Sequence, residues 1–191
     1  MLVSEHVLEL KRQAVHMLAG LFMAGAVYNI KPLLGDYIIL PMAAIVVGLY
    51  VVPRVGAHLP VVSHLLHHFE RDHDKIDFPF SGAFWYNLGI IAPVMMLPLK
   101  TACAIIVVLS IGDAVSTIIG RNYGRHRIGK KSVEGFLAFA VLAGIAASFV
   151  VGPEKAFVFS IAGGLIEFNE WFDDNFSIPV GLTALALALT L

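Results

Sequence analysis

Long apolar runs separated by short polar segments dominate the hydrophobic pattern of this chain. The runs recur from one end of the sequence to the other, and the mean hydropathy is +0.82. They occupy residues 13–30, 37–53, 84–98, 101–120, 134–152, 156–168 and 178–191. A membrane-spanning helix needs about 20 apolar residues, and shorter runs can use polar flanks or thin the bilayer locally. The pattern therefore predicts an all-α, polytopic membrane helix bundle with about seven transmembrane helices.

One further segment, residues 62–71, is amphipathic rather than uniformly apolar. Its polar face comprises His64, His67, His68 and Arg71, and apolar residues occupy the opposite face. Such a segment typically lies along the membrane surface, so we expect an amphipathic interfacial helix here. The histidines also suggest a zinc site, but no cysteine accompanies them, so a wetted polar face is the preferred interpretation.

Composition supports a membrane-embedded chain. Of the 191 residues, 58% are hydrophobic and only 14% are charged, whereas soluble domains carry about 25% charged residues. Residues 1–191 are expected to form one integral membrane domain, with the lipid bilayer as its surroundings and no nucleic-acid partner. Glu5 and Glu9 interrupt the basic leader that a cleaved signal peptide requires, so we expect the first helix to be retained.

The basic residues predict an orientation for the bundle. With seven spans and a cytoplasmic N-terminus, only Lys31, Lys100 and Lys155 of the 13 basic residues fall outside. Cytoplasmic loops of membrane proteins are enriched in lysine and arginine. We therefore expect a multi-pass protein of the cell membrane, with its N-terminus and its polar clusters on the cytoplasmic side.

Asp113 is a carboxylate inside the apolar run 101–120. It lies seven residues before Gly120, which places it about 10 Å below the cytoplasmic end of a helix. Gly112, Ser116 and Gly120 form a row of small residues that permits close helix packing. Ionisable groups in membrane segments are costly to bury and usually functional. The alternative is that Asp113 pairs with a lysine or hydroxyl only to hold the bundle together.

A basic loop follows this run. It carries Arg121, Gly124, Arg125, Arg127, Gly129, Lys130 and Lys131. The spacing is close to a P-loop, but the loop follows a membrane helix rather than a β-strand, so we expect a different phosphate cradle. Ser132 stands where a helix N-cap would, and a helix start favours phosphate binding. The alternative is an ordinary loop that contacts lipid headgroups.

Carboxylates stand on both sides of this loop in the sequence, at Asp113 and Glu134, and a further group precedes the last apolar run, 178–191. Glu134 either complements a helix dipole or shares a metal with Asp113. The later cluster contains Glu167, Glu170, Asp173, Asp174 and Asn175. Its oxygen atoms suit Mg²⁺ or ribose contacts, although for Glu170 and Asp173 a solvated acidic loop is the preferred interpretation. Near the N-terminus, Lys11, Arg12 and His16 lead into the first helix. They either contact substrate or are only a basic pair that extends to the membrane surface and a packed histidine.

Taken together, these motifs resemble the CTP-dependent polyprenol kinase family, which includes dolichol kinase, phytol kinase and CTP-dependent diacylglycerol kinase. The shared pieces are Glu9-x-Lys11-Arg12-x-x-x-His16-x-x-x-Gly20, Gly112-Asp113-Ala114, Ile119-Gly120-Arg121-x-x-Gly124, Lys131-Ser132-Val133-Glu134-Gly135, Glu167, Asp174-Asn175 and Ile178-Pro179. The resemblance covers nearly the whole chain, and the central block from Gly112 to Gly135 is its most specific part.

The resemblance implies a multi-pass enzyme that transfers the γ-phosphate of CTP to a lipid alcohol with Mg²⁺ or another divalent cation. It implies these residue roles: Asp113 and Glu134 catalytic; Asp113, Glu134 and Asp174 for the metal; Arg121, Gly124, Lys130, Lys131, Ser132, Gly135, Asp174 and Asn175 for the nucleotide; Arg12, His16 and Glu167 for the substrate. Three alternatives stay open: a phosphatidate cytidylyltransferase-like enzyme, a cation transporter and a non-catalytic scaffold. A homo-oligomer also stays open.

Overall fold

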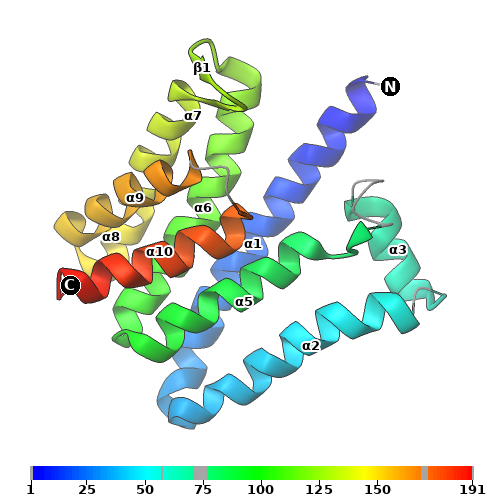
Figure 1. The fold of residues 1–191 in the computed structure, drawn as a ribbon, viewed down its shortest axis with the longest axis horizontal. Coiled ribbons are helices and arrows are strands. Elements are labelled where there is room, and N and C mark those ends of the chain that lie inside the picture. Colours follow the sequence, from blue (N-terminus) through cyan, green and yellow to red (C-terminus); the bar gives the residue numbers. More distant parts are fainter. Residues whose placement is uncertain (1, 57, 71–76, 169–171, 191) are drawn as a thin grey trace.

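The computed structural model describes residues 2–56, 58–70, 77–168 and 172–190, and these form a helical bundle with one small hairpin (Figure 1). Its elements are α1 (Leu2–Leu34), the 3₁₀-helix η1 (Gly35–Ile38), α2 (Ile39–Val55), α3 (Pro60–Phe69), α5 (Ser81–Met96), α6 (Leu99–Tyr123), β1 (Arg127–Ile128), β2 (Lys131–Ser132), α7 (Val133–Ala138), the π-helix η2 (Phe139–Ala143), α8 (Gly144–Val151), α9 (Pro153–Glu167) and α10 (Asp174–Ala188). All seven apolar runs are helical over most of their length. Arg71 and Glu170 lie outside the described residues.

Helix α6 is the centre of the bundle. Every residue from 101 to 110 is buried, as expected for a helix that is apolar all round. Helix α1 packs against one side of α6, and α7, η2, α8 and α9 pack against another (Figure 1). Helix α10 packs across α5 and also contacts α9. The end of α6 is therefore surrounded by segments that are far apart in the sequence.

The outer helices leave large apolar side chains exposed. Phe22 is 78% exposed, Leu33 83% and Phe149 86%. Extensive apolar surface of this kind indicates contact with lipid rather than water. Three described stretches are long and apolar enough to cross a membrane, namely Val7–Val55, Leu99–Tyr123 and Val133–Val151. The chain is thus a helical membrane protein.

The structure does not reproduce the expected count of seven spans. Helices α5, α9 and α10 contain only 16, 15 and 15 residues, which is short for a bilayer core about 30 Å thick. Helices α1 and α2 follow one another through η1 as one continuous helical stretch. Apolar composition alone did not distinguish full spans from these shorter helices.

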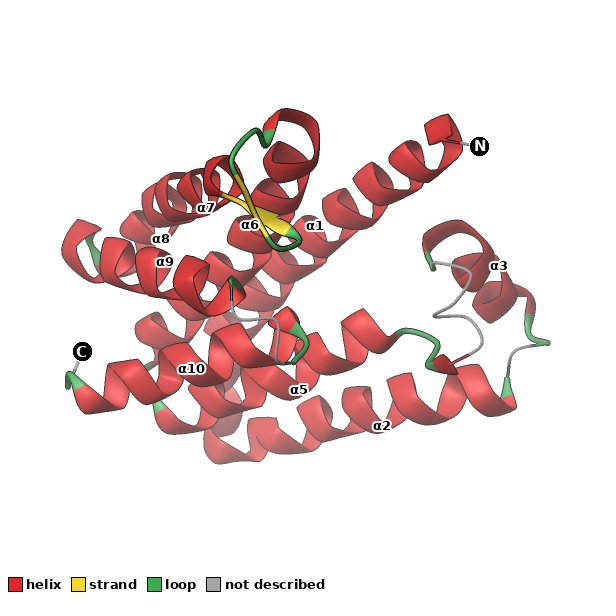
Figure 2. Cartoon of the chain, turned by 45° about the horizontal axis from the view of Figure 1, so that its top comes forward, coloured by secondary structure: helices red, strands yellow, loops and turns green. Residues whose placement is uncertain are grey.

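The basic loop after α6 folds into an antiparallel hairpin at the end of the bundle (Figure 2). Arg127 pairs with Ser132, and Ile128 pairs with Lys131. Gly129 has a φ of 62° in the turn, a left-handed conformation that glycine adopts without strain. Ser132 then caps α7, because its Oγ accepts a hydrogen bond of 3.1 Å from the backbone N–H of Gly135. The predicted N-cap is confirmed.

The last helix begins earlier than its apolar run suggested. Asp173 is the N-cap residue of α10 and accepts a hydrogen bond of 3.0 Å from the N–H of Asn175. Pro179 lies inside the helix and has no N–H to donate to the carbonyl of Asn175. A Cβ on Gly89 of α5 would lie 2.6 Å from that carbonyl oxygen. Glycine at this position lets α5 and α10 cross closely and fixes the start of α10 beside α6.

The π-helical turn η2 aims Phe139 at the centre of the bundle. Phe139 is fully buried, and an added Cβ on Gly112 of α6 would lie 2.4 Å from its Cζ. The expected close packing along the row of small residues is present here. The aromatic ring holds η2 against the helix that carries Asp113.

We predict that Gly112→Ala destabilises the protein. The new methyl group has no room beside the ring of Phe139, and overpacking of this kind costs about 1–3 kcal/mol. The measurement is the melting temperature of the detergent-solubilised protein, monitored by size-exclusion chromatography. Gly25→Ala is the matched control, because no heavy atom lies within 4 Å of the added Cβ there. Adding Phe139→Leu to Gly112→Ala should restore part of the lost melting temperature. Equal melting temperatures of Gly112→Ala and Gly25→Ala would contradict the close packing of Gly112 on Phe139.

Candidate active site

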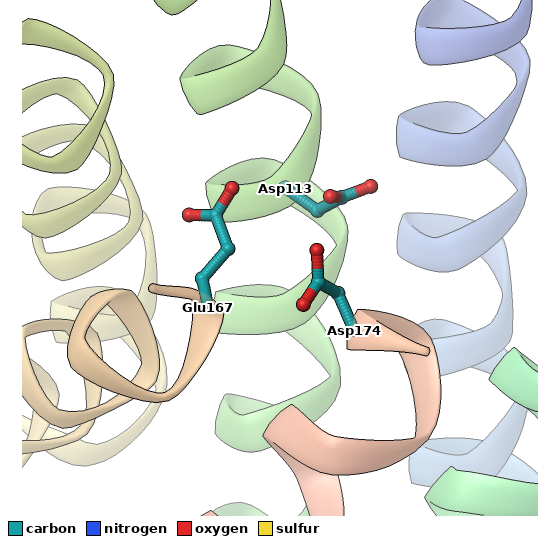
Figure 3. A group of neighbouring side chains, drawn as sticks. All are labelled: Asp113, Glu167 and Asp174. Atoms are coloured by element: carbon teal, nitrogen blue, oxygen red, sulfur yellow. The ribbon is translucent and has the colours of Figure 1, made fainter. Parts of the chain in front are cut away.

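Three carboxylates from three helices meet beside the central helix. Asp113 comes from α6, Glu167 from the last residue of α9 and Asp174 from the first residue of α10 (Figure 3). One oxygen atom of each carboxylate lies within 4.8 Å of the others. Glu167 is buried, and the other two are half-buried. Such a group of hard oxygen donors fits the ligand preference of Mg²⁺.

Lys131 binds two of these carboxylates. Its Nζ lies 2.8 Å from Oε1 of Glu167 and 2.7 Å from Oδ2 of Asp174, and Ser116 donates a hydrogen bond of 2.7 Å to the same Oε1. Burial lowers the pKa of the Lys131 ammonium, but the charges of Glu167 and Asp174 raise that pKa by more, so the net shift is upward. Lys131 therefore stays charged and ties β2 to the ends of α9 and α10.

Asp113 lies toward α1 rather than toward this lysine. Its Oδ2 lies 3.6 Å from Nε2 of His16, and Figure 3 shows the carboxylate directed toward the neighbouring helix. The ring of His16 packs edge-on against Tyr86 of α5, with ring centres 5.2 Å apart. The hydroxyl of Tyr86 is in turn 2.9 Å from Oγ of Ser110. Aromatic packing thus orients the histidine at the carboxylate.

A second ionic group links α1 to the end of α6. Glu9 is buried, and its carboxylate oxygens lie 3.1 Å from Arg12 and 3.4 Å from Arg121. Gln13 also donates a hydrogen bond of 3.0 Å to Glu9. Glu9, Arg12 and Gln13 are spaced at i, i+3 and i+4, so they share one face of α1. Glu9 therefore holds two arginines on the same side of the bundle as Asp113.

These groups line one cavity of about 410 Å³, within the size range of small-molecule sites. Of the residues predicted from the sequence, the cavity brings together Arg12, Asp113, Arg121, Lys130, Lys131, Ser132, Gly135, Glu167, Asp174 and Asn175. They come from α1, α6, the hairpin, α7, α9 and α10. His16 contacts Asp113 but does not line this cavity.

The structure keeps Glu134 and Gly124 out of the cavity lining. The Glu134 carboxylate lies 2.7 Å from Nδ1 of His126 and accepts the backbone N–H of that residue, so it is held at the hairpin instead. Glu167 takes the place beside Asp113 and Asp174 that the sequence suggested for Glu134. Gly124 ends α6 where a Cβ would lie 2.7 Å from Oγ of Ser132, so it allows the hairpin to approach the helix.

Several lining residues were not assigned to the site from the sequence. Among them are Glu9, Gln13, Ser116 and Asp173. The spacing of Glu9, Arg12 and Gln13 could have revealed one shared helix face. Ser116 was interpreted only as a small residue for packing, and Asp173 only as part of a solvated loop. Their roles depend on which distant segments meet, which spacing along one helix does not specify.

Charge is divided between two sides of the cavity. On one side, Lys131 binds Glu167 and Asp174 while Asp113 lies close to both, which leaves an excess of negative charge. On the other, Arg121, Arg127 and Lys130 bring positive charge from the end of α6 and the hairpin. Arg127 donates a long hydrogen bond of 3.4 Å to the Gly120 carbonyl. This division suits a divalent cation beside a group rich in phosphate.

Comparison with known proteins gives two similar sequences. The chain is 30% identical to dolichol kinase of Saccharomyces cerevisiae over 136 residues, which cover 64% of this chain and 25% of that protein. It is 29% identical to dolichol kinase sec59 of Schizosaccharomyces pombe over 115 residues, which cover 55% of this chain and 22% of that protein. No family model and no solved structure matches the chain significantly.

The matched regions span about a quarter of the length of these curated relatives. Both relatives are named as dolichol kinases. The similarity agrees with the motifs that cross the cavity, from Arg12 on α1 to Asp174 on α10. The two dolichol kinases thus support the assignment of this chain to the polyprenol kinase family.

Proposed function

We propose that this chain is a CTP-dependent lipid-alcohol kinase, which transfers the γ-phosphate of CTP to a polyprenol such as dolichol. The observation that carries the proposal is the cavity in which three clustered carboxylates face a cationic rim at one end of a membrane helix. Phosphoryl transfer requires mainly positioning and charge stabilisation, and this cavity offers groups for both. The choice of CTP follows from the family resemblance.

The cationic rim is the proposed triphosphate site. Arg121 and Lys130 would neutralise the phosphate oxygens, and Arg127 lies on the same rim. Gly135 also lines this cavity, and a Cβ there would be 2.9 Å from the carbonyl oxygen of Ser116, so the start of α7 packs directly on α6. Asn175, at the start of α10, also lines this cavity, and its amide nitrogen would contact the nucleotide.

The acidic cluster is the proposed metal site. Asp113, Glu167 and Asp174 would hold Mg²⁺ or another divalent cation, since their oxygens already converge within 4.8 Å. When bound, the cation supplies charge neutralisation for the phosphate oxygens. Lys131 binds Glu167 and Asp174 and orients their carboxylates.

Asp113 is also the proposed base. The lipid hydroxyl oxygen attacks the γ-phosphorus and forms the new P–O bond, the bond to the β–γ bridging oxygen breaks, and CDP leaves. The hydroxyl proton passes to the Asp113 carboxylate, which lies within the apolar run of α6. Nε2 of His16 lies 3.6 Å from this carboxylate.

The proposed location is the cytoplasmic face of the cell membrane, in a multi-pass arrangement. The cavity end carries Arg12, Arg121, Arg127, Lys130 and Lys131. Lys31, Lys100 and Lys155 belong to the other ends of α1, α6 and α9. Because basic residues concentrate on the cytoplasmic side, this distribution supports a cytosolic nucleotide entrance.

We predict transfer of the γ-phosphate, and not of the nucleotide, to the lipid. The purified protein with Mg²⁺ and a polyprenol should give labelled lipid from γ-labelled CTP and none from α-labelled CTP. The measurement is lipid-extractable radioactivity, compared across four nucleoside triphosphates and a panel of polyprenols and diacylglycerol. Label from the α-phosphate would instead indicate a cytidylyltransferase.

We predict that Asp113→Asn lowers kcat by at least about 100-fold, because an amide cannot take the hydroxyl proton and is a poorer metal ligand. The measurement is steady-state transfer in vesicles, together with size-exclusion chromatography to verify folding. Asp36→Asn is the matched control, because Asp36 is exposed in η1, away from the cavity. Near-normal turnover by a folded Asp113→Asn protein would refute the assignment.

We predict that Glu167→Gln and Glu134→Gln differ in their Mg²⁺ dependence. Glu167→Gln should raise the half-saturating Mg²⁺ concentration about tenfold or more, because it removes one oxygen charge from the cluster. Glu134→Gln should leave that concentration unchanged, because its carboxylate is bound to His126. The measurement is activity as a function of free Mg²⁺, and the reverse pattern would favour Glu134 as the ligand.

A further inference from the structure

A second cavity of about 300 Å³ adjoins the first. It lies among α1, α5 and α6, with contributions from α3 and the start of α10. Five residues line both cavities, namely Arg12, Gln13, Gly82, Asp113 and Asn175. The two cavities therefore meet at the carboxylate proposed as the base.

The body of this second cavity is apolar. Its lining includes Ala19 and Met23 of α1 and Ala83 of α5. Gly20 lies where α1 and α6 approach so closely that a Cβ would overlap Ser110. At the rim, Val15 is 45% exposed and Leu65 of α3 is 40% exposed. In a membrane protein, exposed apolar side chains at a rim give access from the lipid phase.

The inner end of the cavity carries unsatisfied polar atoms. Within the described part of the chain, the buried side-chain atoms that lack a hydrogen-bond partner are Oε1 of Gln13, Nε2 of His16 and Oδ1 of Asn175. All three residues line this cavity. Buried polar atoms are almost always hydrogen-bonded in proteins. Their concentration beside Asp113 indicates a ligand that hydrogen-bonds there.

The chemistry of these atoms selects the ligand group. The amide oxygens of Gln13 and Asn175 can only accept a hydrogen bond, and the ring nitrogen of His16 donates or accepts according to its tautomer. A phosphate oxygen without a proton would be repelled by two acceptors and by Asp113. A hydroxyl group donates to an acceptor and also accepts from a donor, so it satisfies this set.

We propose that the second cavity is the acceptor subsite, which binds a long-chain lipid alcohol with its hydroxyl group first. The hydroxyl contacts Gln13, His16 and Asn175 beside Asp113, and the hydrocarbon tail passes between α1 and α5 to the bilayer. This inference rests on the proposed kinase function and specifies where its lipid substrate binds. Gln13 and His16 are positioning residues for the hydroxyl.

Tryptophan substitution along the tail path tests the subsite. Ala19→Trp and Ala83→Trp fill the cavity from opposite helices, and both positions are exposed enough to tolerate a larger side chain. Ala14→Trp is the matched control, since Ala14 is an exposed alanine on the same helix that lines neither cavity. Two readouts are used in nanodiscs: the KM for a polyprenol, and photo-cross-linking by a diazirine-bearing isoprenoid alcohol.

We expect Ala19→Trp and Ala83→Trp to raise the KM for the polyprenol at least tenfold and to remove most cross-linking, while the KM for CTP stays unchanged. The control should match the parent protein in both readouts. Unlabelled polyprenol should compete with the probe at least tenfold better than its methyl ether, which has no hydrogen to donate. Equal competition by the two compounds would contradict the proposed hydrogen bonds to the hydroxyl group.

The outcomes separate the subsite from the kinase function. If polyprenol is phosphorylated but Ala19→Trp and Ala83→Trp behave as Ala14→Trp does, the subsite is wrong and the kinase function stands. If no nucleotide supports transfer but both cavity variants still abolish alcohol-specific cross-linking, the kinase function is wrong and the alcohol site stands. Absence of both transfer and cross-linking would overturn both.

Discussion

The arrangement of this bundle depends on neutralising buried carboxylates at the end of a membrane helix. Glu167 and Asp174 are contributed by α9 and α10, and neither element supplies the charge that balances them. Lys131 of the hairpin contacts both at less than 3 Å. Because an unpaired charge in such a place is far more costly than a paired one, the lysine stabilises the approach of these three segments. The lysine thereby joins the hairpin to the ends of α9 and α10 beside Asp113.

Much of the fold follows from local sequence signals. The apolar runs identify the helices, and Ser132 caps α7 as its position before the fifth run predicted. The row of small residues also has its expected consequence: Gly112 lies against Phe139, and Gly120 lies against Ser132. Each of these features is encoded within one or two turns of the chain. Spacing alone therefore specifies them.

The sequence predicted site residues only where a residue type is unusual in its sequence context. Asp113 stands out because a carboxylate in an apolar run is unusual, and Lys131 because the basic loop follows it directly. Glu134 and Glu167 could not be ranked in the same way. Both follow glycine-rich segments near polar clusters, and the difference between them is that His126 binds Glu134 at the hairpin. The contact between His126 and Glu134 depends on how the loop folds back, and the hydrophobic pattern of the sequence does not predict this. The number of full spans could not be predicted for the same reason, since the length of each helix in the bundle depends on tertiary packing.

The proposed ligands of the two cavities require different surroundings, and the two cavities provide both. A triphosphate carries charge that must stay near water, whereas a polyprenol tail must stay in hydrocarbon, and the reacting atoms must still meet. Asp113 lies ten residues before the end of α6, a depth of about 15 Å along the helix axis. At that depth the polar cavity on the hairpin side and the apolar cavity between α1 and α5 share one wall. Glu9 fixes Arg12 and Arg121 on the polar side, and Tyr86 fixes His16 on the apolar side. The boundary between the two environments therefore runs through the carboxylate itself, so neither ligand has to leave its own solvent to reach the other.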